Sequence, residues 1–224
     1  MIELNNLAVG ELPQVMREET LMEGYWSLVR DAAAYCAELH NAGVRCSVDV
    51  FEVAADAERM KAIVAETMVP GDYILGLNRL LSHHRFKPIS LGKVEDADPR
   101  HIRALESGGL RNTGALLLAA RAESDRANLS AETGVPLGEL DRLVTAADLM
   151  RKPGVKATKV RLFTASGIRS LKHLGEQEPR AFRSQLEELI AKTGIVKAIP
   201  TPKEVMSDVY WARLYPVIIS MPEP

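Results

Sequence analysis

The residues best suited to do chemistry lie in one basic segment that contains no acidic side chain. A Pro-Gly-Val turn at residues 153–155 separates a predicted helix end from a new helix start. Backbone N–H groups of such a turn, and of the helix that follows, have no intrahelical acceptors and point toward an anion along the helix dipole. Neighbouring cationic side chains contact phosphodiester groups without reading bases. The predicted phosphate-binding residues are Lys152, Gly154, Val155, Lys156, Lys159 and Arg161.

Charge is divided unevenly along the chain, although the formal net charge is only −2. Residues 151–224 hold 13 Lys and Arg against 7 Asp and Glu, a net of +6, whereas residues 1–150 have a net of −8. The segment 151–175 has seven basic residues and no carboxylate. This pattern favours a polyanionic partner if the seven side chains share a face. The alternative is a solvated helix surface whose counter-charges come from the acidic N-terminal part.

Catalytic and metal-binding patterns are not supported by the spacing of reactive residues. No nucleophile beside a base, Gly-rich phosphate loop or recognisable carboxylate pair occurs, so no catalytic residue is predicted and a non-catalytic protein is favoured. Cys36, His40 and Cys46 fit no zinc signature, and Cys36 falls in an apolar helix stripe. The acidic run 95–98 ends in Asp98, whose local role is to cap a helix before Pro99. We therefore expect no metal and no cofactor.

Helix signals dominate the elements that must position the basic segment. Apolar residues recur at helical spacing over 20–41, 56–68 and 72–84, and the capping and proline signals predict further helices near 98–108, 157–165, after 178 and over 205–214. The one β-like run is 44–53, whose tail could equally begin a helix. We expect an all-α fold, with at most one short β segment.

Comparison of the chain with itself reveals a tandem duplication. The segment 102–111 aligns with 160–169 at an offset of 58 residues, and 131–135 aligns with 191–195 at an offset of 60. Such self-similarity is the mark of a repeated supersecondary unit. We predict a helical N-terminal segment at 1–87, a first unit at 88–147, and a second unit with its tail at 148–224.

The segments 109–117, 147–155, 166–174 and 199–202 resemble those of an uncharacterised prokaryotic family of unknown function with tandem helix-hairpin-helix-like units, over about residues 100–214. Helix-hairpin-helix modules bind DNA non-specifically through a glycine-hydrophobic-glycine turn, so the resemblance implies DNA contact near Gly154. The sequence departs from that pattern at Lys156, which stands where the second glycine is expected. This side chain either blocks close approach to a phosphate or supplies charge by another route. In the first unit, three carboxylates at 95–98 stand where an anion would bind and would repel it, so no phosphate site is predicted there.

Composition indicates a globular protein outside the membrane. No run of about 18 apolar residues is present, and the N-terminus lacks the basic and apolar regions of a secretory signal, which makes the cytoplasm the expected location. Two cysteines do not indicate a disulfide scaffold.

Three functional hypotheses follow from these observations. The first is a cytoplasmic accessory protein that binds the backbone of DNA or RNA through the basic hairpin. The second is a protein-interaction or assembly scaffold whose N-terminal helices pair with a second copy or another protein. The third is an enzyme or small-ligand-binding protein with a pocket between the N-terminal helices and the duplicated half, where Tyr25, His40, Tyr73 and His83 could gather.

Overall fold

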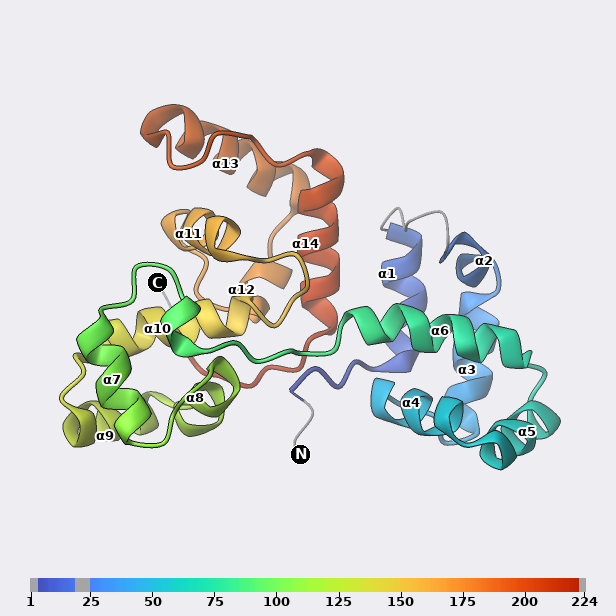
Figure 1. The fold of residues 1–224 in the computed structure, drawn as a ribbon. Helices are drawn as coiled ribbons and strands as arrows, with labels where there is room; N and C mark the ends of the chain where they lie inside the picture. The colour runs from blue at the N-terminus through green and yellow to red at the C-terminus, as the bar shows by residue number, and fades with distance from the viewer. Residues whose placement is uncertain (1–3, 19–24, 222–224) are drawn as a thin grey trace.

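The described residues of the computed structural model, 4–18 and 25–221, form a purely helical structure (Figure 1). Within these two ranges no β-strand occurs, and the extended contacts are two isolated bridges, Ala8 with Cys46 and Ser90 with Asn112. The expected all-α fold is therefore confirmed. No helix in the same ranges is both long and apolar enough to span a bilayer.

The N-terminal part forms one group of helices, on the right in Figure 1. Its longest helix, α6, begins after Pro70 and buries a stripe of leucine and aromatic side chains. Its elements are η1 (Val9–Glu11), α1 (Leu12–Glu18), α2 (Trp26–Val29), α3 (Ala32–Asn41), α4 (Ser47–Ala55), α5 (Ala57–Glu66) and α6 (Gly71–His83).

The single helix predicted over 20–41 is wrong for its described part, because the chain forms two helices, α2 and α3. Residues 20–24 of that prediction lie outside the described residues. In a continuous helix the carbonyl of Leu28 would accept a bond from the residue four positions on. Instead it accepts a 3.2 Å hydrogen bond from the Tyr73 hydroxyl of α6. A tertiary contact thus competes with the local pattern and breaks the helix near Arg30.

The β-like run at 44–53 is also mainly helical. Cys46 makes the isolated bridge to Ala8, and Ser47 begins α4. The cause is a capping interaction, because the Asp49 carboxylate accepts the N–H groups of Arg45 and Cys46 at 2.8 and 2.9 Å. The alternation of valines therefore serves a helix start, as the second interpretation of this run allowed.

Residues 99–214 form two successive runs of four helices. The first run is α7 (Pro99–Ser107), α8 (Thr113–Ala119), α9 (Glu123–Thr133) and α10 (Leu137–Leu149), preceded by η3 (Leu91–Lys93). The second is α11 (Ala157–Ala165), α12 (Leu171–Gly175), α13 (Pro179–Thr193) and α14 (Pro202–Leu214).

Equivalent positions of the two runs share backbone features. Gly109 and Gly167 both have positive φ angles, 88° and 93°. Asn112 and Ser170 both cap the next helix through the side chain. The order of elements agrees with the self-alignment. The helix-hairpin-helix character of the units and the boundaries at 87/88 and 147/148 stay predictions.

Two hydrophobic cores divide the molecule in an order that differs from the chain order. One core joins the N-terminal helices to α11–α14, and Leu149 and Val155 belong to it. The other core fills the space among α7–α10, with Leu4 and Ile219 packed into it. The N-terminal helices consequently share buried surface with the second run of helices, and the turn between α10 and α11 lies where they meet.

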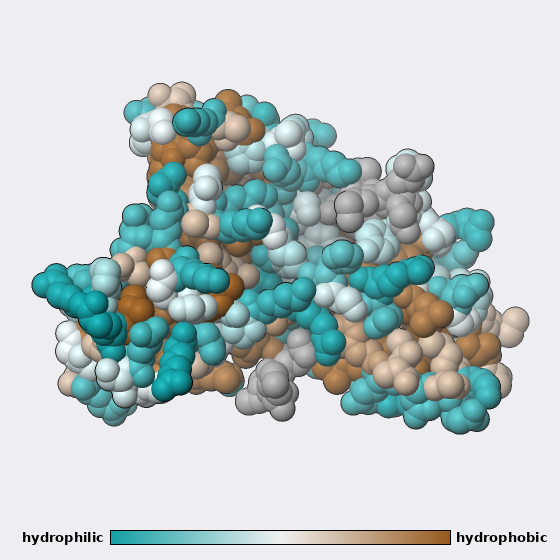
Figure 2. All heavy atoms as spheres, viewed as in Figure 1, coloured by the Kyte–Doolittle hydropathy of each residue, from teal (hydrophilic) through white to brown (hydrophobic). Residues whose placement is uncertain are grey.

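Several exposed apolar side chains lie in the N-terminal part of the chain. Val64, Met68 and Leu75 are all exposed there, with Met68 at 86%. Figure 2 shows a brown and tan area on this side of the face, over α4 and α5. Scattered apolar side chains are common on soluble proteins, so self-association through these helices stays a prediction.

Gly175 sets the distance between α12 and α14. A Cβ at this position would lie 3.0 Å from the backbone nitrogen of Arg213 and 3.2 Å from the carbonyl carbon of Ala212. We expect Gly175→Ala to lower the free energy of unfolding by about 1–3 kcal/mol, because backbone atoms must move. Urea unfolding followed by far-UV circular dichroism measures this effect.

Gly138 in α10 provides the matched control. A Cβ there meets nothing within 4 Å and its φ is not positive, so Gly138→Ala should stabilise the protein by up to about 1 kcal/mol. Equal stability of the two variants would contradict the close packing of α12 on α14.

Candidate ligand pocket at the junction of the helical groups

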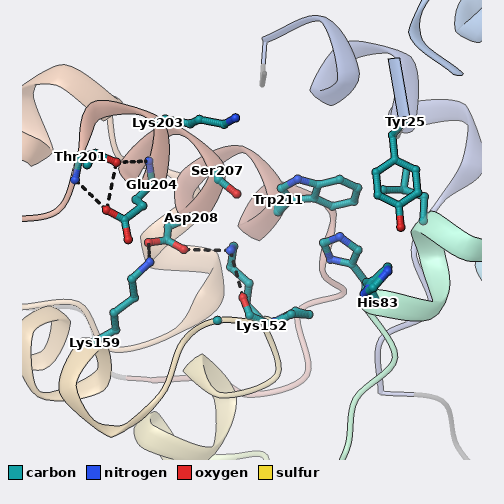
Figure 3. Close-up of a pocket in the computed structure, with 14 residues that line it drawn as sticks. Tyr25, His83, Lys152, Lys159, Thr201, Lys203, Glu204, Ser207, Asp208 and Trp211 are labelled. Atoms are coloured by element: carbon teal, nitrogen blue, oxygen red, sulfur yellow. Dashed lines mark hydrogen bonds and ion pairs between the residues drawn. The ribbon is translucent and has the colours of Figure 1, made fainter. Parts of the chain in front are cut away.

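A pocket of about 430 Å³ opens where the N-terminal helices face α14 and the turn between α10 and α11 (Figure 3). Its volume lies within the range of small-molecule sites. The lining combines aromatic rings, three lysines and two carboxylates. The residues are Tyr25, Leu80, His83, His84, Lys152, Pro153, Gly154, Lys159, Thr201, Lys203, Glu204, Ser207, Asp208 and Trp211.

Two lysines converge on one carboxylate in this pocket. Lys152 Nζ lies 2.8 Å from one oxygen of Asp208, and Lys159 Nζ lies 2.7 Å from the other (Figure 3). The side chains of Asp208 and Lys152 are 2% and 6% exposed, while Lys159 is partly open at 22%. A buried carboxylate is stable only when it is paired, and here it has two partners. The local charge of this triad is positive.

The turn that carries Lys152 is shaped by Gly154, whose φ is +84°. Val155 donates its N–H to the carbonyl of Lys152 at 3.2 Å and is buried. Gly154 itself is exposed at the pocket. The left-handed conformation lets the chain reverse between α10 and α11 without a steric penalty. Lys152 and Lys159 therefore approach Asp208 from the two ends of one turn.

Three α14 residues with hydrogen-bond donors face the same space. Lys203, Ser207 and Trp211 stand four residues apart, so they share one face of α14. The helix begins at a capping box, in which Thr201 donates its N–H to Glu204 at 2.8 Å. This bond, followed by the bond from the Thr201 hydroxyl, lowers the pKa of Glu204. Glu204 is thus already engaged by the backbone.

Aromatic side chains form one wall of the pocket, beside Trp211 of α14. His84 stacks on Trp211 with ring centroids 3.6 Å apart and planes 21° from parallel. Its Nδ1 lies 2.9 Å from the Tyr215 hydroxyl. Burial, followed by the charge of Lys152, lowers the pKa of His84 to about 3, so the imidazole is neutral at physiological pH. Tyr25 and His83 meet edge to face at 6.1 Å.

A buried polar network holds the helical groups together behind this wall. Arg151, at 1% exposure, pairs with Asp148 at 2.6 Å and donates to Asn5 and to the Pro216 carbonyl. Asn5 in turn donates to the carbonyls of His84 and Arg151 at 2.6 and 2.9 Å. The network joins the N-terminal segment, the end of α6, the α10–α11 turn and the segment after α14. It fixes the relative position of the pocket walls.

The structure brings together some of the six sequence-predicted phosphate-binding residues. Lys152, Gly154 and Lys159 line the pocket. Val155 is a core residue, and Lys156 is exposed. Arg161 lies apart, where it pairs with Glu95 at 3.3 Å and donates to the Ile195 carbonyl.

Carboxylates from outside the basic segment pair with most of its cations. Asp148 forms an ion pair with Arg151, Asp208 with Lys152 and Lys159, and Glu95 with Arg161. Lys172 pairs with Glu176 at 2.9 Å on the surface. These counter-charges come from several separate parts of the chain, and a single basic face does not follow from the run of seven cations.

Two of the four residues suggested for a pocket do line it, namely Tyr25 and His83. His40 is elsewhere on α3, and Tyr73 lies in the separate α2–α6 hollow with Tyr35. No cluster of three metal-ligating side chains occurs in residues 4–18 and 25–221. Sequence reasoning missed Asp208, Lys203, Ser207 and Trp211. The spacing of four that joins Lys203, Ser207 and Trp211 was a signal that could have found those three, whereas no local signal marks Asp208.

The fold and the pocket together define an all-α protein with a ligand-sized cavity between two groups of helices. Residues 96–213 match the model of a family described as Domain of unknown function (DUF4332). Because this match covers more than half of the chain, the chain belongs to that family. The expected membership of an uncharacterised family over about residues 100–214 is confirmed. No curated protein and no solved structure matches the chain. Tyr25, Leu80, His83 and His84 of the pocket lie before the matched region.

Proposed function

We propose that the protein binds a small anionic organic ligand in the pocket between its N-terminal helices and α14. One observation carries the proposal: Lys152 and Lys159 converge on the single carboxylate of Asp208 inside a cavity of about 430 Å³ with aromatic walls. Three lysines and two carboxylates line this cavity, and Glu204 is engaged by Thr201. The excess positive charge acts through a partly dehydrated space, where electrostatic attraction is stronger than in water.

Two lysine substitutions, both after the turn, test the proposal. We expect isothermal titration calorimetry with a panel of small carboxylates and phosphate esters to find a ligand. For that ligand, Lys159→Met should weaken binding by about tenfold or more, since one charge-assisted contact is lost. Lys156→Met removes an exposed lysine three residues away, outside the pocket lining, and should leave the affinity within about twofold.

Absence of binding by every compound of the panel would overturn the proposal. An equal loss in Lys159→Met and Lys156→Met would show that the ligand binds outside the pocket. Far-UV circular dichroism of each variant establishes that the fold is retained, because Lys152 still pairs with Asp208 after Lys159 is replaced.

Contact with the backbone of DNA or RNA is the second candidate function, and the turn at Gly154 favours it. Gly154 has a positive φ and is exposed, and the exposed Lys156 directly follows the buried Val155. This arrangement leaves one cation and the start of α11 accessible to a phosphate.

Fluorescence anisotropy with labelled duplex and single-stranded DNA and RNA tests this candidate. Binding should weaken steeply between about 50 and 200 mM salt, and Lys156→Glu should abolish it. Affinity that survives in Lys156→Glu, or no binding at low salt, would end this candidate. Lys156 thus separates the two functions, since the pocket does not require it.

A further inference from the structure

The donors that face the pocket from α14 indicate what kind of group the ligand carries. Trp211 is 2% exposed, yet its indole N–H has no hydrogen-bond acceptor among the described residues. The indole nitrogen is not sealed in the core, and it is open to the pocket. In Figure 3 it lies on the side of the indole nearest Ser207. When most of a side chain is buried and its donor faces a cavity, the donor forms a hydrogen bond only with an acceptor inside that cavity.

Ser207 and Lys203 extend this set of donors along the helix. No described residue accepts a bond from the Lys203 ammonium group or the Ser207 hydroxyl. Figure 3 shows Lys203 running along α14 toward the N-terminal helices. Ser207 lies about 6 Å along the helix from both Lys203 and Trp211, and the long side chain of Lys203 runs toward them, so the three donors can serve one multi-oxygen group. Lys159 supplies a further cation at the floor.

We propose that the ligand is a phosphate monoester of a planar ring, of about mononucleotide size, an inference that rests on the proposed function. A phosphate presents three terminal oxygens, which suits the donors of Lys203, Ser207, Trp211 and Lys159 better than the two oxygens of a carboxylate. The planar ring lies at the other end of the pocket, where Tyr25 and His83 offer ring faces and edges. The cavity of about 430 Å³ accommodates both parts.

Calorimetry with AMP, adenosine, inorganic phosphate and benzoate tests the ligand class on the full chain. We expect AMP to bind, and adenosine and inorganic phosphate each to bind at least about tenfold more weakly, because each lacks one of the two recognised parts. Trp211→Phe keeps an aromatic ring that can stack on His84 and removes the N–H donor together with the five-membered ring of the indole. This variant should bind AMP about tenfold more weakly and adenosine unchanged.

Ser207→Ala is a second variant, at a partly buried residue on the same face of α14. It should weaken the binding of AMP and leave the binding of adenosine unchanged. The control is Ser184→Ala on α13, whose hydroxyl donates to the Arg180 carbonyl outside the pocket. Equal affinity of AMP for Trp211→Phe, Ser207→Ala and the unmodified protein would overturn the assignment of the phosphate to α14.

The outcomes separate this inference from the function on which it rests. Binding of benzoate or other carboxylates from the wider panel, with AMP weaker than about 1 mM, would overturn the phosphate class and leave ligand binding in the pocket intact. If none of the compounds binds, both the phosphate class and ligand binding in the pocket are overturned. Tight binding of adenosine equal to that of AMP would also overturn the phosphate class, because the donors of α14 would then contribute nothing.

Discussion

Replacement of Arg151 by leucine is expected to lower the free energy of unfolding by about 3–5 kcal/mol, the cost of breaking a buried ion pair from one side. Asp148 is 2% exposed and would keep only the Leu171 N–H, which it accepts at 2.7 Å. The Asn5 side-chain oxygen and the Pro216 carbonyl would each lose their bond from Arg151. The loss therefore reaches three separate segments of the chain, and urea unfolding monitored by circular dichroism measures it.

Arg100→Leu is the matched control for this substitution. Arg100 also pairs with an aspartate, Asp98 at 2.7 Å, but its side chain is 80% exposed. An exposed pair of this kind contributes little to stability because water and salt screen it, and Asp98 retains its capping bond from the Arg100 backbone N–H. A loss in Arg151→Leu no larger than in Arg100→Leu would mean that the buried network does not hold the helical groups together.

The basic turn could be predicted from sequence because its signals are local. Proline and glycine at 153 and 154 mark the end of α10, and Gly154 has the positive φ that this turn requires. The position of Lys152 and Lys159 on either side of the turn follows from chain order alone. What could not be predicted was their partner, because Asp208 lies about fifty residues further along, in α14. A carboxylate-free run in the sequence is not a carboxylate-free surface.

Long-range contacts explain the other differences between sequence and structure. The break between α2 and α3 depends on Tyr73, whose hydroxyl reaches the Leu28 carbonyl across 45 residues. The helical identity of 47–55 was within reach, since Asp49 stands three residues after Cys46 and its carboxylate accepts the Cys46 N–H. The repeat was detectable because its glycines recur at fixed offsets, and Gly109 and Gly167 share one backbone conformation.

The pocket itself depended on a pairing that the self-alignment does not contain. The repeat alone does not say which helices pack against the N-terminal segment. The core places α11–α14 against the N-terminal helices, and the aromatic wall combines His84 after α6 with Trp211 of α14. Tyr25 and His83 could be suggested as pocket residues because they lie on the N-terminal side, but their partners on α14 required the fold.

The stability of the protein is expected to fall by about 2 kcal/mol between pH 7.5 and pH 5 because of His84 alone. In the folded chain, burial and then the charge of Lys152 depress the pKa of His84 from 6.5 to about 3. Below pH 6.5 the unfolded chain takes up a proton on this side chain and the folded chain does not, so acid favours unfolding. Each pH unit in this window costs up to about 1.4 kcal/mol. Paired carboxylates add their own losses only at lower pH, nearer their pKa values.

His84→Gln isolates this contribution, because glutamine can still form a hydrogen bond with the Tyr215 hydroxyl but does not titrate. We expect the variant to be less stable at pH 7.5, since the stack on Trp211 is lost, and to change little between pH 7.5 and 5. His83→Gln, at the exposed neighbouring residue, should keep the pH dependence of the unmodified protein. If His84→Gln loses as much stability toward pH 5 as the unmodified protein, then His84 is protonated in the folded state. The wall beside Lys152 would in that case carry a second positive charge and attract an anionic ligand more strongly in acid.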